Sequence, residues 1–159
     1  MSIQPGDKIP QATLNYLKDG VQAINTDELF AGKKVVLFAV PGAFTPTCSA
    51  KHLPGYVEKL GEFTSRGIDV ACMSVNDAFV MGAWAKDQHV PDSVHMLADG
   101  NGVFAKALGL ELDATAFGMG LRAKRFALYA EDGVVKQVHV EAPGEFKVSA
   151  ADFVLEHLP

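Results

Sequence analysis

Three short, almost continuously apolar runs constrain the fold of this chain most. They are VVLFAV (35–40), VACMSV (70–75) and VHMLAD (94–99), and each is too short for a typical helix. Runs of this kind are typical of strands that are buried on both faces of a sheet. Between the second and third runs, AFVMGAWAKDQ (78–88) carries apolar residues at helical spacing, and Asp77 can cap it. The pattern therefore predicts a βαβ unit, with 35–40 as a central strand.

The other predicted elements surround this unit. We expect a mixed β-sheet flanked by helices, an α/β sandwich that opens with a β-hairpin. The remaining segments are a hairpin of 12–17 and 21–24 that turns at 18–20, a helix over 26–31 capped by Thr26 and ended by Gly32, a helix over 103–110, a hairpin of 125–132 and 134–141 that turns at Asp132-Gly133, and a last helix over 149–158 capped by Ser149.

Length, composition and charge narrow the class of protein. With 159 residues, 48% of them hydrophobic, and no repeat or long linker, the chain suits a single domain over 1–159. A net charge of -5 without a basic stripe argues against nucleic-acid binding. The sequence contains no apolar run of membrane-spanning length and no signal-peptide pattern, so we expect a cytoplasmic protein that does not enter a membrane.

The cysteines and histidines give no metal-binding pattern. Only two cysteines occur, Cys48 and Cys72, and they form no CxxC pair, which argues against a zinc ribbon or a thioredoxin-type redox motif. The five histidines show no HExxH spacing. We therefore expect no metal and no cofactor, and both cysteines should rest as thiols in a reducing compartment.

The segment PGAFTPTCS (41–49) directly follows the first apolar run and places Cys48 in the first turn of a predicted helix. Unpaired backbone N–H groups and the positive end of the helix dipole stabilise an anion there, so Cys48 could be a thiolate at neutral pH. Thr45 lies three residues earlier, within helical reach of the sulfur. The alternative interpretation is a helix-capping loop that holds an inert, buried cysteine.

The same residues resemble a known family. Pro41, Thr45 and Cys48 form PxxxTxxC within VPGAFTPTCSAKHLPGYVEKL, which is similar to the peroxiredoxins of type II, the fifth subfamily. Similarity continues through ACMSVNDAFVMGAW, HMLADGNGVFAKALGLELD and LRAKRFALYAEDGVV, and so covers nearly the whole chain. The resemblance implies a thioredoxin-like fold and a thiol peroxidase that reduces hydrogen peroxide and organic hydroperoxides.

The resemblance also implies roles for individual residues of this segment. Cys48 would be the peroxidatic cysteine, which attacks the peroxide and becomes a sulfenic acid. The hydroxyl of Thr45 would bridge sulfur and substrate, Pro41 would shield the thiolate from water, and Gly42 would allow the backbone to approach the substrate closely. Donors around both oxygens are needed because negative charge develops on the departing oxygen.

An arginine fork can hold thiolate and peroxide together. The family pattern places this arginine directly before Phe-Ala, which selects Arg125, and we interpret Arg122 and Lys124 as a solvated basic edge. His52 follows Cys48 by four residues, but a packing or supporting role is favoured over a general base. Pro54 should kink the helix that begins near the cysteine.

Two routes remain open for the sulfenic acid. Cys72, in the apolar run 70–75, is the internal candidate for the resolving cysteine, although a buried and inert thiol is the alternative. Animal members of the family resolve with a cysteine near the C-terminus, where this chain has Val148 and Ser149. The other route is attack by an external thiol of glutathione or glutaredoxin, or of thioredoxin, and we favour glutathione or glutaredoxin.

Apolar residues that cannot all face one core indicate an assembly. Phe79, Val80 and Trp84 span too wide an arc for one buried stripe, and Phe44 lies in the cysteine loop. Since the resembled subfamily commonly forms dimers through loops at the active site, we expect a homodimer with Phe44 near its centre. The alternative function is a redox-silent thioredoxin-like module for binding or chaperone-like work.

Overall fold

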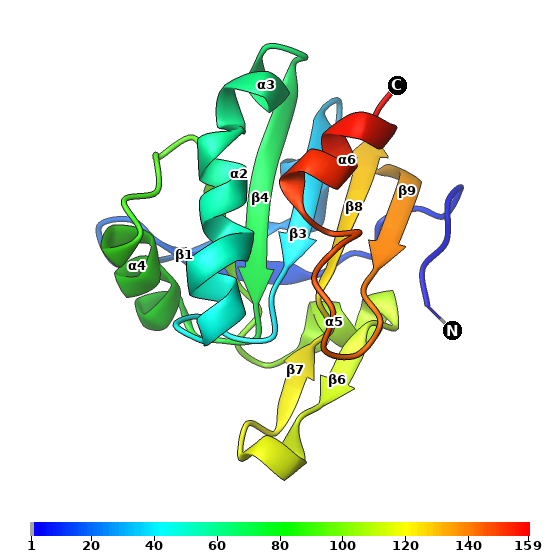
Figure 1. Cartoon of the computed structure of the whole chain (residues 1–159). Coiled ribbons are helices and arrows are strands. Elements are labelled where there is room, and N and C mark those ends of the chain that lie inside the picture. The colour runs from blue at the N-terminus through cyan, green and yellow to red at the C-terminus, as the bar shows by residue number, and fades with distance from the viewer. Residues whose placement is uncertain (1) are drawn as a thin grey trace.

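A computed structural model describes residues 2–159 (Figure 1). Seven strands form the main sheet in the order β2-β1-β5-β4-β3-β8-β9, and β6 pairs with β7 in a separate small sheet. The elements are β1 (Thr13–Leu17), β2 (Val21–Asn25), α1 (Thr26–Phe30), β3 (Lys34–Ala39), a π-helical turn (Cys48–His52), α2 (Leu53–Glu58), α3 (Leu60–Thr64), β4 (Ile68–Ser74), α4 (Ala78–Asp87), β5 (His95–Ala98), α5 (Val103–Leu108), β6 (Glu111–Asp113), a 3-10 turn (Thr115–Phe117), β7 (Leu121–Ala123), β8 (Phe126–Glu131), β9 (Val134–Val140) and α6 (Ala151–His157).

The predicted βαβ unit and its central strand are confirmed. Strand β3 lies between β4, which runs parallel to it, and β8, which runs antiparallel. Helix α4 connects β4 to the parallel strand β5, and the side chain of Asp77 caps it by accepting from Val80 N–H. Residues 35–40 are fully buried, as expected for a strand covered on both faces.

Helices cover both faces of the sheet, so the thioredoxin-like α/β class is confirmed. On one face, Val36 and Phe38 pack with residues of α2, α3, α4 and α6. On the other face, Val35 and Leu37 pack with residues of α1 and α5. Figure 1 shows α2 and α6 in front of the sheet, α4 at its left-hand side and α5 behind its lower end. Successive residues of β3 therefore serve opposite cores.

Both predicted hairpins are present. Strand β1 pairs with β2 and also with β5, which joins the N-terminal hairpin to the main sheet. Strands β8 and β9 turn at Asp132 and Gly133, whose φ angles of 49° and 75° suit the left-handed region that this tight turn needs. Within the described residues, no helix is both long and apolar enough to cross a membrane.

Two predicted helix caps are wrong. Asn25, and not Thr26, caps α1, and the Thr26 hydroxyl instead donates to Pro10 O. Helix α6 begins after Ala150, and the Ser149 hydroxyl donates to Glu141. In both cases, the hydroxyl donates to an acceptor outside the helix and so does not form the helix cap that local patterns predict.

Candidate active site

The cysteine loop connects the end of β3 to a helix. The helix begins at Pro46, which fits the first helical position because no N–H is required there. Its first backbone bond runs from Ser49 N to Thr45 O at 3.0 Å, and the Cys48 side chain is fully buried. The predicted position of Cys48 in the first turn of the helix is confirmed.

The turn that carries Cys48 is π-helical. Leu53 N–H donates to Cys48 O, five residues back, and Pro54 follows directly. Proline has no N–H, and its ring crowds the carbonyl four residues earlier, which favours a widened turn. The kink that we expected at Pro54 stays a prediction, and the structure shows the π-helical turn directly before this residue. The indole N–H of Trp84, a fully buried residue of α4, donates to Ser49 Oγ in this turn at 3.0 Å.

Arg125 contacts Cys48 from the chain segment that leads into the strand next to β3. It directly precedes β8, the neighbour of β3, and its Nη2 donates to Cys48 Sγ at 3.2 Å. Its Nη1 lies 2.8 Å from His52 Nδ1. The structure thus brings together Cys48 and Arg125, the two residues that we expected to form the reactive pair.

The loop before the cysteine is tightly packed. Thr45 Oγ1 donates to Gly42 O at 2.6 Å, so its lone pairs are free to accept a hydrogen bond from a substrate. A Cβ at Gly42 would lie 2.9 Å from Arg122 Nη1 and 3.1 Å from Thr45 Cγ2. These close approaches explain the glycine in physical terms. Pro41 is half-buried at the start of the same loop.

Asn76 anchors this loop, and sequence reasoning missed it. Its Oδ1 accepts from Ala43 N–H at 3.0 Å and from Ser74 Oγ at 2.5 Å. The residue stands between β4 and α4 and reaches across 33 positions of sequence. The only local pattern next to Asn76 is the helix cap formed by Asp77, which does not indicate a contact with the cysteine loop.

The interpretation of Arg122 as part of a solvated edge is wrong. Arg122 is half-buried, and its Nε donates to Met119 O at 2.9 Å while its Nη1 donates to Pro41 O at 3.3 Å. It therefore secures the cysteine loop against strand β7. Lys124 is exposed, as expected.

His52 is buried and neutral at physiological pH. Its pKa is lowered from 6.5 to about 3, first because burial penalises the imidazolium and second because the Arg125 charge repels it. The hydrogen bond with Ser149 O acts in the opposite direction. Since the lowered pKa means that the ring is already deprotonated, His52 cannot gain a proton easily, which argues against a general base and agrees with the supporting role.

We expect acid to destabilise the fold through His52. The pKa in the folded protein is lowered, so this group's contribution to stability is complete above pH 6.5 and is lost as the pH falls toward 3. At two pH units below the ordinary pKa of histidine, the free energy of unfolding is lower by about 3 kcal/mol than at neutral pH. Urea unfolding measures the free energy of unfolding of the wild type and of His52→Phe, at neutral pH and at pH ~4.5. The stability difference between them should shrink at the lower pH, and parallel losses would contradict the assignment.

Cys72 is buried in the middle of β4. It pairs with Phe38 of β3 and belongs to the same core cluster as Cys48, and both cysteines are free thiols. Burial, and then the nearby Cys48, raise the pKa of Cys72 well above its usual value. It is therefore held as a neutral thiol, a poor nucleophile.

The segment 141–150 closes the far side of the site, which local patterns did not indicate. Glu141 Oε2 accepts from Ser149 N, Ser149 Oγ and Lys147 N at 2.7–2.8 Å. Burial alone would raise the pKa of Glu141, but these bonds outweigh it and lower the value. Among residues 2–159, no three His, Cys, Asp or Glu side chains gather as a metal ion would require.

Comparisons with known proteins point to one family. The Redoxin family model matches residues 4–155. The chain is 53% identical to "Peroxiredoxin-2E, chloroplastic" of Arabidopsis thaliana, over 99% of this chain and 70% of that protein. It is 48% identical to "Peroxiredoxin-2B" of the same plant, over 98% of each. The solved structure of reduced Prx3 in complex with H2O2 from Vibrio vulnificus matches with a TM-score of 0.92 and 51% identity, over 97% of this chain and 98% of that one.

Proposed function

Because this chain belongs to the type II peroxiredoxins, it is a thiol-dependent peroxidase, and we propose that Cys48 is its peroxidatic residue, with Arg125 and Thr45 as partners. The observation that carries the assignment is the 3.2 Å contact between Arg125 Nη2 and Cys48 Sγ. A guanidinium at this distance can donate to the sulfur and to a peroxide oxygen beside it, where negative charge develops during the attack.

The proposed reaction needs no group beyond those in the site. The Cys48 thiolate attacks one peroxide oxygen, an S–O bond forms and the O–O bond breaks. The departing oxygen takes the proton of the attacked hydroperoxide and leaves as water or an alcohol, while Cys48 becomes a sulfenate, which takes a proton from water to give the sulfenic acid. Arg125 and the N–H groups of the first helical turn donate to the developing charge, and Thr45 Oγ1 accepts from the peroxide O–H.

For the second half of the cycle, we propose an external thiol of glutathione or glutaredoxin as the reductant. Cys72 is fully buried on a central strand, and its raised pKa keeps it protonated. An internal disulfide would require the Cα atoms to lie within ~7 Å and the cysteine turn to unwind. External thiols of this kind are abundant in the cytoplasm, where we place the protein and where its two free thiols stay reduced.

Mass spectrometry after one equivalent of peroxide tests this route. With glutathione present, we expect a glutathione adduct on Cys48, in the wild type and equally in Cys72→Ser. Without glutathione, we expect one added oxygen, and further oxygens as peroxide increases. A loss of two hydrogens that disappears in Cys72→Ser would show an internal disulfide and overturn the proposal. Thioredoxin as the sole effective reductant in turnover would also contradict it.

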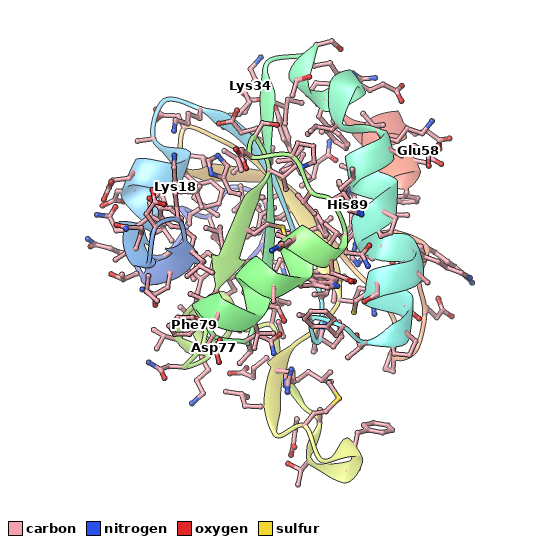
Figure 2. The ribbon with its side chains drawn as sticks, turned by 90° about the vertical axis from the view of Figure 1, so that its left-hand side faces the viewer. Lys18, Lys34, Glu58, Asp77, Phe79 and His89 are labelled. Atoms are coloured by element: carbon pink, nitrogen blue, oxygen red, sulfur yellow. The ribbon has the colours of Figure 1, made fainter. Side chains whose placement is uncertain are left out.

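We further propose a homodimer built around the cysteine loop. Phe44 is 52% exposed although it adjoins Thr45, and Phe79 at the start of α4 is 64% exposed. Figure 2 shows Phe79 beside Asp77 at that end of the helix. The two aromatic residues belong to connected segments, because Asn76 bonds Ala43. A twofold contact would cover this apolar surface and support the loop.

Phe44→Asp should weaken the dimer and lower peroxidase activity together. A carboxylate in a buried interface is costly to desolvate, and the loop would lose its support. Light scattering at micromolar concentration and peroxide consumption measure the two effects on the same sample. The exposed Lys124 offers a control, Lys124→Asp, with an added acidic group outside the loop. A monomeric wild type, or unchanged mass and turnover in Phe44→Asp, would contradict the interface.

A further inference from the structure

His52 links the arginine of the site to the segment 141–150. The guanidinium of Arg125 presents Nη2 to Cys48 Sγ and Nη1 to His52 Nδ1, at 3.2 and 2.8 Å. Because a guanidinium can only donate, Nδ1 must accept. The ring proton therefore lies on Nε2, which donates to Ser149 O at 3.1 Å. The two partners together select one tautomer and one orientation of the ring.

The carbonyl that receives the imidazole is itself firmly held. Tyr56 Oη donates to the same Ser149 O at 2.7 Å. The N–H and the hydroxyl of Ser149 both donate to Glu141 Oε2. Glu141 N–H donates to the backbone carbonyl of Arg125 at 3.0 Å, so the chain of hydrogen bonds that starts at the Arg125 guanidinium returns to the backbone of the same residue. The segment that orients the histidine is thus fixed to the residue that the histidine contacts.

Aromatic side chains exclude other partners from the ring. Ring centroids of Phe38, Phe146 and Tyr56 lie 4.9, 5.0 and 5.7 Å from that of His52. Phe146 also stacks under Arg125, with Cζ 5.9 Å from its ring centroid. The imidazole therefore occupies a dry pocket, where a well-aligned hydrogen bond to a cation is strong.

We propose that His52 is a positioning residue, which holds the guanidinium of Arg125 so that Nη2 faces the Cys48 sulfur. The inference rests on the proposed function. A long arginine side chain has many rotamers, and fixing one of its terminal nitrogens fixes the plane of the fork. A neutral acceptor does this without neutralising the guanidinium, whereas a carboxylate would compete with the thiolate for the positive charge.

His52→Phe tests the proposal because it keeps an aromatic ring in the pocket and removes both hydrogen bonds. Tyr129→Phe is the matched control, since it also removes a hydrogen bond of a buried aromatic residue, the one to Glu131, but no contact with His52, Ser149 or Arg125. We measure oxidation of Cys48 by one equivalent of H2O2 in a rapid-quench single turnover. His52→Phe should react about tenfold to a hundredfold more slowly. Tyr129→Phe should stay within about threefold of the wild type, and equal losses would reduce His52 to a structural role.

A double-mutant cycle with Arg125→Lys separates the path through Arg125 from a general loss of structure. In the lysine background, His52→Phe should cost less than about threefold, because the oriented fork is already gone. His52→Asn should recover most of the wild-type rate, since its amide oxygen can accept where Nδ1 does. Additive losses, or His52→Asn as slow as His52→Phe, would overturn the proposal. A wild type that does not consume peroxide would instead overturn the proposed function.

Discussion

Replacement of Cys48 by serine is expected to abolish peroxide consumption with dithiothreitol as reductant, a loss of roughly a thousandfold or more. A serine hydroxyl stays protonated at neutral pH and forms no sulfenic acid, so the contact with Arg125 has no anion to stabilise. The assay follows the disappearance of hydrogen peroxide at fixed enzyme concentration. Serine is close to cysteine in size, and the fold should therefore persist.

Cys72→Ser is the matched control for this experiment. It changes the other cysteine of the chain, which is buried and protonated in β4. Since dithiothreitol can reduce the sulfenic acid directly, the control should keep most of the wild-type rate. Equal rates for Cys48→Ser and the wild type would instead favour a redox-silent binding module.

Arg125→Lys is expected to lower the rate of Cys48 oxidation by about a hundredfold. Lysine keeps the positive charge, but its single ammonium cannot present one nitrogen to the sulfur and another to His52, as the fork does. Single-turnover oxidation by hydrogen peroxide measures the effect, and a thermal unfolding curve checks that the variant is folded.

Arg122→Lys tests whether the correct arginine was chosen. Arg122 contacts the carbonyls of Met119 and Pro41, and not the sulfur. Lysine can keep one of these bonds, so the expected loss is under about tenfold. A larger loss for Arg122→Lys than for Arg125→Lys would show that the site is built around the other guanidinium.

Much of the fold follows from local sequence patterns. The runs 35–40, 70–75 and 94–99 have the composition of strands buried on both faces, and they form β3, β4 and β5 at the centre of the sheet. The turns at Asp19-Gly20 and Asp132-Gly133 require positive φ angles, which short polar residues and glycine adopt readily. Such signals are contained in a few neighbouring residues.

The small sheet of β6 and β7 could not be predicted in this way. Each strand has only three residues, and the glycines of the connecting segment obscure the alternation that marks a strand. The order of strands in the main sheet likewise depends on contacts between distant segments, such as the pairing of β1 with β5.

The site likewise contains features that local patterns predict and features that depend on residues distant in sequence. The position of Cys48 in a first helical turn follows from the strand, the prolines and the helix around it. The partners of His52, Arg122 and Ser149 lie 73 to 97 positions away or across a loop, so local patterns could not identify these partners. For Arg122 and Ser149, the local interpretation was wrong because a distant acceptor outcompetes solvent or a helix end.

The hydrogen bond between Trp84 and Ser49 gives this protein a built-in optical reporter. Trp84 is the single tryptophan of the chain, it is fully buried, and its indole binds the residue next to Cys48. Indole emission responds to the polarity and hydrogen bonding around the ring. Oxidation of the neighbouring sulfur changes the surroundings of this buried ring, so oxidation of Cys48 should change the intrinsic fluorescence, which stopped flow can follow without a label.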